Sequence, residues 1–281
     1  MGANSAARRL AKRIMYPVLN EHTYRYMQAA SKAWDIRGGK WTEPELDLIP
    51  FAFEPGETAL DIGANYGLYS YHLSRRAGGR GRIYAFEPVP FTCKSLALVA
   101  RLLRFRNVEI VQKGCSDRNG QITFTVPVQA SGAMAAGLAY IGGRDDDRAG
   151  KEKQVRWQAT RDVTCEVVAL DEFLPAVERL SLIKCDVEGA ELFAFRGAER
   201  LIERHLPSVI CEINPWYLEG FGVRLEELTD FFFAKGYALY HYAADGGRGR
   251  LREVEVSEVS EDNYTFIHPS RRGRFAALLG G

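Results

Sequence analysis

From residue 57 onward, short apolar runs alternate with segments of helical periodicity. The runs at 57–63, 82–88 and 108–114 are continuously apolar, which is typical of strands in a parallel sheet that helices cover on both faces. The segments between them, 67–77 and 90–105, repeat apolar residues at helical spacing. This rhythm predicts a doubly wound α/β domain with right-handed crossovers.

The alternation of strand and helix patterns is interrupted in the middle of the chain and then resumes. Residues 121–128 alternate like an antiparallel strand, whereas 129–160 are rich in glycine, alanine and charge. We predict a mobile loop in the middle of 129–160, and a lid over a site is the sharper interpretation. The second half is predicted to contain strands in 180–189, 207–216, 237–242 and 263–269, helices at 190–205 and 224–236, and a polar connection at 243–262.

The first strand ends in an acidic residue, Asp61, and two glycines follow it, Gly63 and Gly67. An open parallel sheet binds its ligand at the carboxyl ends of its strands, and a glycine there lets the ligand approach the backbone. A dinucleotide-binding turn would read G-x-G-x-x-G, so that a helix N-terminus can hold a pyrophosphate. The pattern here is D-x-G-x-x-x-G. Its aspartate would repel phosphate and suits a positively charged group, such as an amino-acid ammonium.

A second acidic residue, Glu87, ends the next strand. A carboxylate at that position can accept both hydroxyls of a ribose. One acid for an ammonium and one for a ribose, on either side of a glycine turn, predict S-adenosylmethionine as the cofactor. The alternatives are that Asp61 caps the following helix and that Glu87 is a solvated strand end. We favour cofactor binding.

Composition narrows the choice of partners and compartment. The chain has 37 Lys and Arg against 36 Asp and Glu, so its charge gives no reason to expect a nucleic-acid partner. No apolar run reaches the length of a membrane span, and the N-terminus lacks a secretory signal pattern. The five cysteines form no C-x-x-C pair, and at least three fall in apolar strands. They are expected to be buried residues of a protein in a reducing, cytoplasmic compartment.

Residues 1–50 are predicted to form a helical extension, separate from a domain at 51–281. Within it, residues 7–15 place alanine and aliphatic side chains on one helical face and basic side chains on the other. We favour a helix that packs on the domain or on a second subunit, which leaves a homodimer open. The alternative is a basic helix that rests on a membrane surface and gives the protein a peripheral location.

Five stretches of the chain resemble, in order and spacing, the FkbM-type methyltransferases: "LDIGANYGLYS", "IYAFEPVP", "NVEIVQKGCSDRNG", "LIKCDVEGAELFAFRGAERLI" and "VICEINP". The resemblance covers residues 50–242. It implies a class I methyltransferase fold, with a mostly parallel seven-stranded sheet whose last strand is antiparallel, and S-adenosylmethionine as the cofactor. Named members of that family mostly methylate hydroxyl groups on sugars and polyketides.

The same resemblance implies roles for individual residues. Around the methionine moiety it places Asp61, Gly63, Asn65 and Gly67, and it places Glu87 on the ribose. The turn after the third strand holds two candidates for the adenine contact, Ser116 and Asp117; the alternatives are a buried Cys115 and a solvated Asp117.

Three carboxylates are candidates for catalysis: Asp186, Glu188 and Glu212. They follow two strands that the family's sheet order makes neighbours. A neutral hydroxyl needs a base or a metal ion to assist the loss of its proton. The carboxylates are expected to act as base and positioning groups, or to hold Mg²⁺ through oxygen ligands. For Asp186 and Glu188, helix capping is the alternative. A further candidate base is His241, near a strand end, where a histidine is more often packed or solvated.

These observations together predict an S-adenosylmethionine-dependent O-methyltransferase. Its expected acceptor is a hydroxyl of a sugar, glycolipid or polyketide-like molecule. Two alternatives stay open: an N-methyltransferase acting on a small molecule, and a non-catalytic module that binds the cofactor. A nicotinamide-dependent oxidoreductase is disfavoured because the G-x-G-x-x-G pattern is missing.

Overall fold

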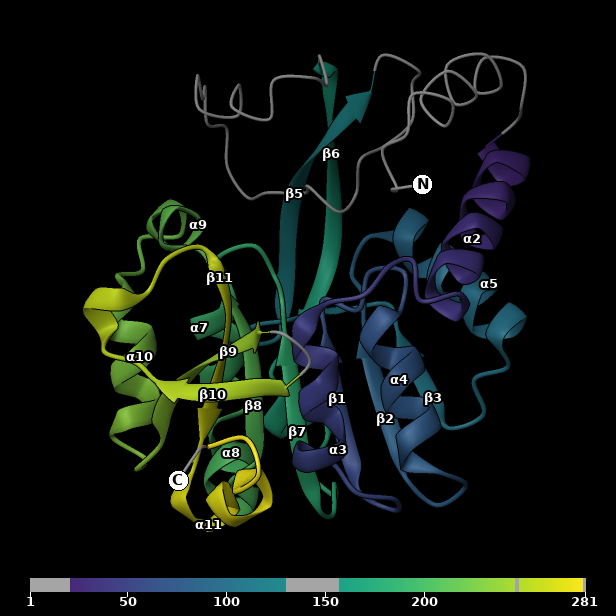
Figure 1. Ribbon diagram of the computed structural model, residues 1–281. Helices are drawn as coiled ribbons and strands as arrows, with labels where there is room; N and C mark the ends of the chain where they lie inside the picture. Colours follow the sequence, from purple (N-terminus) through teal and green to yellow (C-terminus); the bar gives the residue numbers. More distant parts are fainter. Residues whose placement is uncertain (1–20, 130–156, 246–247, 280–281) are drawn as a thin grey trace.

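An eight-stranded sheet organises the residues that the computed structural model describes, which are 21–129, 157–245 and 248–279 (Figure 1). The strand order is β10-β9-β11-β8-β7-β1-β2-β3. Neighbours from β8 to β3 run parallel, and β11 is antiparallel to both of its neighbours. The strands are β1 Thr58–Ile62, β2 Arg82–Phe86, β3 Val108–Val111, β7 Leu180–Cys185, β8 Ser208–Ile213, β9 Ala238–Asp245, β10 Arg248–Glu253 and β11 Asp262–Ile267.

This topology confirms the predicted α/β fold of the class I methyltransferases, including the antiparallel last strand, β11. The predicted strand number is one too low, because part of the expected polar connection forms β10. Within β10, Leu251 is buried, whereas its charged neighbours Arg250 and Arg252 are exposed. An edge strand needs only one buried face and commonly carries charges that discourage further pairing. A charged strand of this kind has no apolar run that the sequence could reveal.

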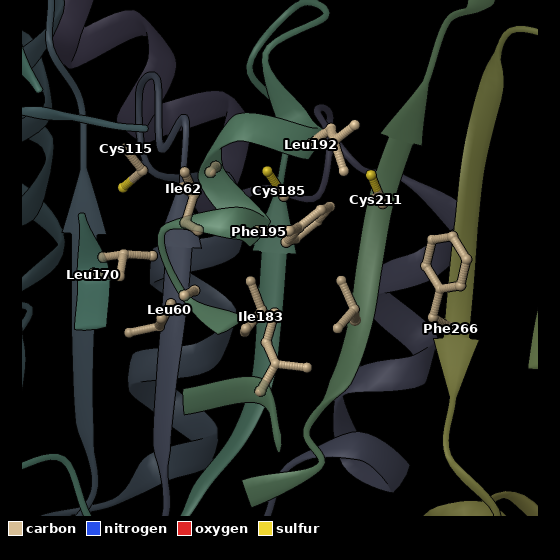
Figure 2. Close-up of a cluster of buried hydrophobic side chains, with 14 of the residues drawn as sticks. Leu60, Ile62, Cys115, Leu170, Ile183, Cys185, Leu192, Phe195, Cys211 and Phe266 are labelled. Atoms are coloured by element: carbon tan, nitrogen blue, oxygen red, sulfur yellow. The ribbon is translucent and has the colours of Figure 1, made fainter. Parts of the chain in front are cut away.

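Helices cover both faces of the sheet (Figure 1). One face packs against α7 Glu191–Arg196, α8 Glu199–His205 and α10 Leu225–Phe233, and Figure 2 shows part of this cluster. The opposite face packs against α3 Ile49–Ala52, α4 Leu68–Ala77 and α5 Pro90–Leu103. Successive side chains of β1 point to opposite faces, so Leu60 lies in the first cluster and Ala59 in the second. The remaining α-helices in the described ranges are α2 Glu21–Arg37, α6 Leu170–Phe173, α9 Pro215–Gly220 and α11 Pro269–Arg272.

The prediction of a single helix at 190–205 is wrong, because the helix is interrupted at Gly197 and forms α7 and α8. An ideal Cβ on Gly197 would lie 1.9 Å from the carbonyl oxygen of Ser116. After the break, the Asp171 carboxylate accepts hydrogen bonds from the backbone N–H groups of Arg200 and Leu201. The Ser116 turn therefore packs against the break, and Asp171 caps the start of α8. Helical periodicity in the sequence cannot reveal contacts with segments so distant along the chain.

A second, three-stranded sheet has the order β4-β6-β5. Its strands are β4 Gly114–Cys115, β5 Gly120–Gln129 and β6 Trp157–Val168. The long antiparallel pair of β5 and β6 extends beyond the edge of the main sheet (Figure 1), and it confirms the antiparallel strand predicted at 121–128. The predicted loop and lid fall mainly on 130–156, which lie outside the described residues.

The N-terminal part of the described chain packs on the domain. Helix α2 lies beside α5 (Figure 1), and Ile36, Leu48 and Ile49 are buried in the same cluster as α4. The predicted basic helix at 7–15 lies outside the described ranges. Within those ranges, no helix combines the length and apolar character that crossing a membrane requires. All five cysteines are buried and free, as predicted.

The contact at Gly197 can be tested with Gly197→Ala. We expect the added methyl group to force the Ser116 turn away and to lower the free energy of unfolding by roughly 1–3 kcal/mol, the usual cost of overpacking. Gly273→Ala is the matched control, because nothing lies within 4 Å of its ideal Cβ and its φ is −59°. Urea unfolding measures both. Equal stability of the two variants would contradict the proposed contact.

Candidate functional site

The turn after β1 lies directly against the turn after β7. The backbone N–H of Asp186 donates to the carbonyl of Ile62, at 3.0 Å. At Gly63, φ is +80°, and an ideal Cβ would lie 1.8 Å from the Asp186 carbonyl oxygen. Any side chain at Gly63 would therefore push the two turns apart, and the left-handed backbone there also favours glycine.

The next glycine of the turn, Gly67, is the residue from which α4 begins. Its φ is +84°, and an ideal Cβ would lie 2.6 Å from Leu96 Cδ1 of α5. Glycine at this position therefore allows both the turn and the close packing of α5 beneath it. The free N–H groups of the first turn of α4 start at this point.

Glu87 is buried at the end of β2 and fixes the turn from the other side. Its Oε2 accepts a hydrogen bond from the Asn65 backbone N–H at 3.1 Å, and its Oε1 accepts one from the Val89 N–H at 3.0 Å. Burial raises the pKa of Glu87 to about 7, although these two hydrogen bonds oppose the rise. Each oxygen retains a lone pair that can accept a further hydrogen bond.

A cavity of about 200 Å³ opens between these turns. Its polar lining includes Asn65, whose φ is +49° and whose side-chain oxygen is buried without a hydrogen-bond partner among the described residues. Its remaining polar or small lining residues include Gly63, Glu87, Gly114, Asp186, Glu188 and Glu212. The candidate residues from the glycine turn, from the end of β2 and from the carboxylate group thus line one cavity.

The three candidate carboxylates converge at this cavity. Asp186 and Glu188 follow β7, Glu212 lies in β8, and one oxygen from each lies within 4.8 Å of the others. Burial, followed by repulsion from Asp186, raises the pKa of Glu188 to about 8. Burial and the adjacent Asp186 carboxyl raise the pKa of Glu212 well above its ordinary value. The cluster therefore holds at least one proton near neutral pH.

Two buried residues that support this cluster were not predicted from the sequence. The Lys184 side chain is 2% exposed, and its Nζ lies 3.0 Å from Asn263 Oδ1 and 3.8 Å from Asp186 Oδ2. Burial alone would lower the pKa of Lys184, but the nearby carboxylates raise it above its ordinary value. The Glu191 carboxylate accepts hydrogen bonds from the backbone N–H groups of Val187 and Gly189, and so it fixes the turn after β7. A lysine within the apolar run "LSLIKCDV" is the signal, because lysine is almost never fully buried without a partner.

Asp61 lies behind the cavity wall rather than on it. It is 2% exposed, is not among the lining residues and accepts a 2.5 Å hydrogen bond from Ser70 Oγ. Burial raises the pKa of Asp61 to about 6, against the lowering effects of Ser70 and Lys184. In β1 it pairs in register with Lys184 of β7.

Four other candidates also do not line the cavity: Gly67, Ser116, Asp117 and His241. The buried Ser116 donates its hydroxyl to Asp117 at 3.2 Å, and its backbone N–H donates to Val168; the neighbouring Gly114 and Cys115 line the cavity instead. His241 Nε2 lies 2.9 Å from Asp262 Oδ2, and β11 separates its strand from β8. The structure therefore does not bring His241 together with the carboxylates.

The comparisons with known proteins concern most of the described domain. A family model described as "Methyltransferase FkbM domain" matches residues 61–239. "Methyltransferase 1" of Beauveria bassiana is 28% identical over 165 residues, which are 54% of this chain and 62% of that protein. "Methyltransferase sdnD" of Sordaria araneosa is 28% identical over 189 residues, which are 61% of this chain and 71% of that protein.

In two further matches, one to a curated protein and one to a solved structure, the aligned region covers a smaller share of the other protein. "AMB antimetabolite synthetase AmbE" of Pseudomonas aeruginosa is 26% identical over 208 residues, which are 65% of this chain and 10% of that protein. A solved structure, the methyltransferase FkbM of Methylobacillus flagellatus KT, is 16% identical with a TM-score of 0.48, and the match covers 76% of this chain and 44% of that one. The chain thus spans less than two thirds of several of the proteins that it matches.

The raised pKa of Glu188 predicts that stability falls as the pH rises from 4.5 to about 8. Between pH 4.5 and about 8 the folded protein keeps Glu188 protonated while the unfolded chain ionises it, so stability is lost as the pH rises through this window. Glu188→Gln removes the carboxyl group that is costly to ionise in the folded protein. It should stabilise the protein by roughly 1–2 kcal/mol at about pH 8, with little effect at about pH 5. Urea unfolding without divalent cations measures this. Glu109→Gln, at an exposed position on β3, is the control, and an equal gain there would refute the assignment.

Proposed function

This chain belongs to the family of FkbM methyltransferases, and on that premise we propose that it is an S-adenosylmethionine-dependent O-methyltransferase. The proposed acceptor is a hydroxyl of a sugar, glycolipid or polyketide-like small molecule. One observation carries the proposal: the carboxylates Asp186, Glu188 and Glu212 share a cavity with the glycine turn and Glu87. A site for a methyl donor and groups that can take up a proton are thus adjacent.

The residues around the cavity fit the cofactor. Glu87 has free lone pairs for the ribose hydroxyls, and the orphaned side-chain oxygen of Asn65 offers an acceptor for an N–H donor. Gly63 lines the cavity, Gly67 shapes the turn beside it, and the acidic lining favours a cation. Asp61 acts from behind the wall by supporting the turn, and Ser116 and Asp117 are assigned to the adenine end because they adjoin the lining residues Gly114 and Cys115.

When bound, the cofactor supplies a methyl group on a positively charged sulfur and leaves as S-adenosylhomocysteine. We assign the role of general base to Asp186, because the Lys184 ammonium 3.8 Å away stabilises negative charge on that carboxylate. Asp186 would accept the proton of the acceptor hydroxyl, and the hydroxyl oxygen would receive the methyl group. Glu212 and Glu188, whose pKa values are raised, are protonated in this state and donate hydrogen bonds that hold the acceptor. His241 is hydrogen-bonded to Asp262 and does not line the cavity, so the proposal does not use it as the base.

A divalent cation such as Mg²⁺ is the alternative role for the three carboxylates, since hard cations prefer oxygen ligands. The buried Lys184 beside Asp186 favours the base mechanism, because a fixed ammonium repels a second cation from the same carboxylate. N-methylation of a small molecule is the second candidate reaction, because an amine needs less help from a base.

Cofactor binding is tested by calorimetric titration of the full chain with S-adenosylmethionine and S-adenosylhomocysteine. We expect wild-type binding in the micromolar range, and a loss of about tenfold or more in Glu87→Gln, which keeps the size of the side chain but removes one charged acceptor. Glu109→Gln, at an exposed position on the adjacent strand, should bind like wild type. Absence of wild-type binding would overturn the proposal.

The base assignment is tested with methyl-labelled cofactor and a panel of hydroxylated and amine acceptors. We expect label in an ether, and a fall of about 10²–10⁴-fold in kcat for Asp186→Asn, with the affinity for S-adenosylhomocysteine nearly unchanged. Label in an amine, with only a small loss in Asp186→Asn, would favour N-methylation. Loss of the wild-type rate in EDTA, restored by Mg²⁺, would favour the metal role over the base role.

A further inference from the structure

A second hollow, of about 640 Å³, is lined mainly by the C-terminal parts of α4 and α5 and the residues that follow them. Four arginines from three helix ends and one loop line it: Arg37, Arg75, Arg104 and Arg106. We call it the basic hollow. It shares no lining residue with the cavity that holds Glu87 and the carboxylates. Whatever it binds is therefore distinct from the proposed cofactor, and the inference does not rest on the proposed function.

The positive charge around the basic hollow is local. The chain as a whole has 37 basic and 36 acidic residues. Residues 63–108 nevertheless contain one acid, Glu87, which is buried beside the other cavity. The basic residues in the same range are Arg75, Arg76, Arg80, Arg82, Lys94, Arg101, Arg104 and Arg106. A nearly neutral protein thus concentrates positive charge over α4, α5 and their connections, where the charge can raise the local concentration of an anion.

No internal ion pair accounts for these arginines. Across the ranges that the structure describes, none of the four is paired with a carboxylate, whereas Arg200, Arg252 and Arg274 are. All four are exposed. A basic residue near a helix C-terminus is stabilised by the helix dipole, which accounts for Arg37, Arg75 and Arg104 one at a time. It does not account for Arg106, nor for the convergence of all four on one hollow.

The walls of the basic hollow add aromatic surface to the charge. The rings of Tyr71 and Phe105 lie 6.1 Å apart at an interplanar angle of 31°, and the Arg75 guanidinium carbon lies 5.6 Å from the Tyr71 centroid. Guanidinium groups match the geometry of phosphate oxygens and can bind them with two hydrogen bonds. Aromatic rings suit the organic part of a ligand, and the volume is in the usual range of small-molecule sites.

From this combination we propose that the basic hollow binds a small phosphorylated molecule, a phosphate or diphosphate ester. Its phosphate groups lie among the four arginines, and its organic part lies against Tyr71 and Phe105. A concave site of this size, with both rings in its lining and only partly exposed, favours a small ligand over an extended nucleic acid or a flat membrane surface.

The test is calorimetric titration of the full chain with inorganic pyrophosphate and with phenyl phosphate. We expect saturable binding of both, and a loss of about tenfold or more in the double variant Arg104→Gln and Arg106→Gln, because each lost charged hydrogen bond is worth about tenfold. Phe105→Leu should weaken phenyl phosphate more than pyrophosphate. The matched control, Arg196→Gln with Arg204→Gln, removes two exposed arginines from α7 and α8 and should bind both probes like wild type.

Several outcomes would overturn the proposal. Wild-type protein that does not saturate with either probe refutes it, as does an equal loss in the control variant, which would indicate diffuse charge attraction. Displacement of pyrophosphate by S-adenosylhomocysteine would place the anion in the other cavity. Tight binding of an RNA oligonucleotide or of phosphatidylserine vesicles, without binding of either probe, would assign the surface to a macromolecule. Thermal melting of both double variants excludes unfolding as the cause of a loss.

Discussion

The candidate site depends on how closely the turn after β1 approaches the turn after β7. At Gly63 a Cβ would collide with the backbone of Asp186, so only glycine lets the two strand ends meet. The bond between Ile62 and Asp186, and the hold that Glu191 has on the second turn, fix the approach from both sides. Asp186 and Glu188 follow β7, while Glu87 and Glu212 belong to the strands that flank β1 and β7, so this contact brings all four to one cavity.

Joining these strand ends also brings many acids together, and Lys184 offsets part of their repulsion. It lies in β7 between Asp61 of β1 and Ile210 of β8, with Asn263 and the Tyr69 ring beside it. One ammonium cannot neutralise Asp61, Asp186 and Glu212 together, so burial and mutual repulsion keep some carboxyls protonated. A cluster with more acids than fixed cations is poised to attract a positively charged ligand and to exchange protons.

Local sequence patterns were sufficient to predict the strands and the residues at their ends. The apolar runs predicted the parallel strands, and the D-x-G-x-x-x-G turn and Glu87 predicted which edge of the sheet holds the cavity. Contacts between distant segments could not be predicted in this way. The break at Gly197 depends on Ser116, more than 80 residues earlier, and the partner of Lys184 is Asn263 on another strand. For the same reason, the sequence did not show that Asp61 lies behind the cavity wall, since its burial depends on the packing of Ser70 from α4.

The long pair of β5 and β6 has a consequence for how such a domain can diverge. The two strands pair continuously from Gly120 and Val167 to Gln129, with a register shift only near the far end, while β4 touches β6 over two residues. Equal numbers of residues added to both strands at that far end would keep their pairing in register, whereas a residue added to one strand alone would invert its faces beyond that point. The ribbon can therefore change length by matched additions to its two strands, without altering the strands that carry the carboxylates.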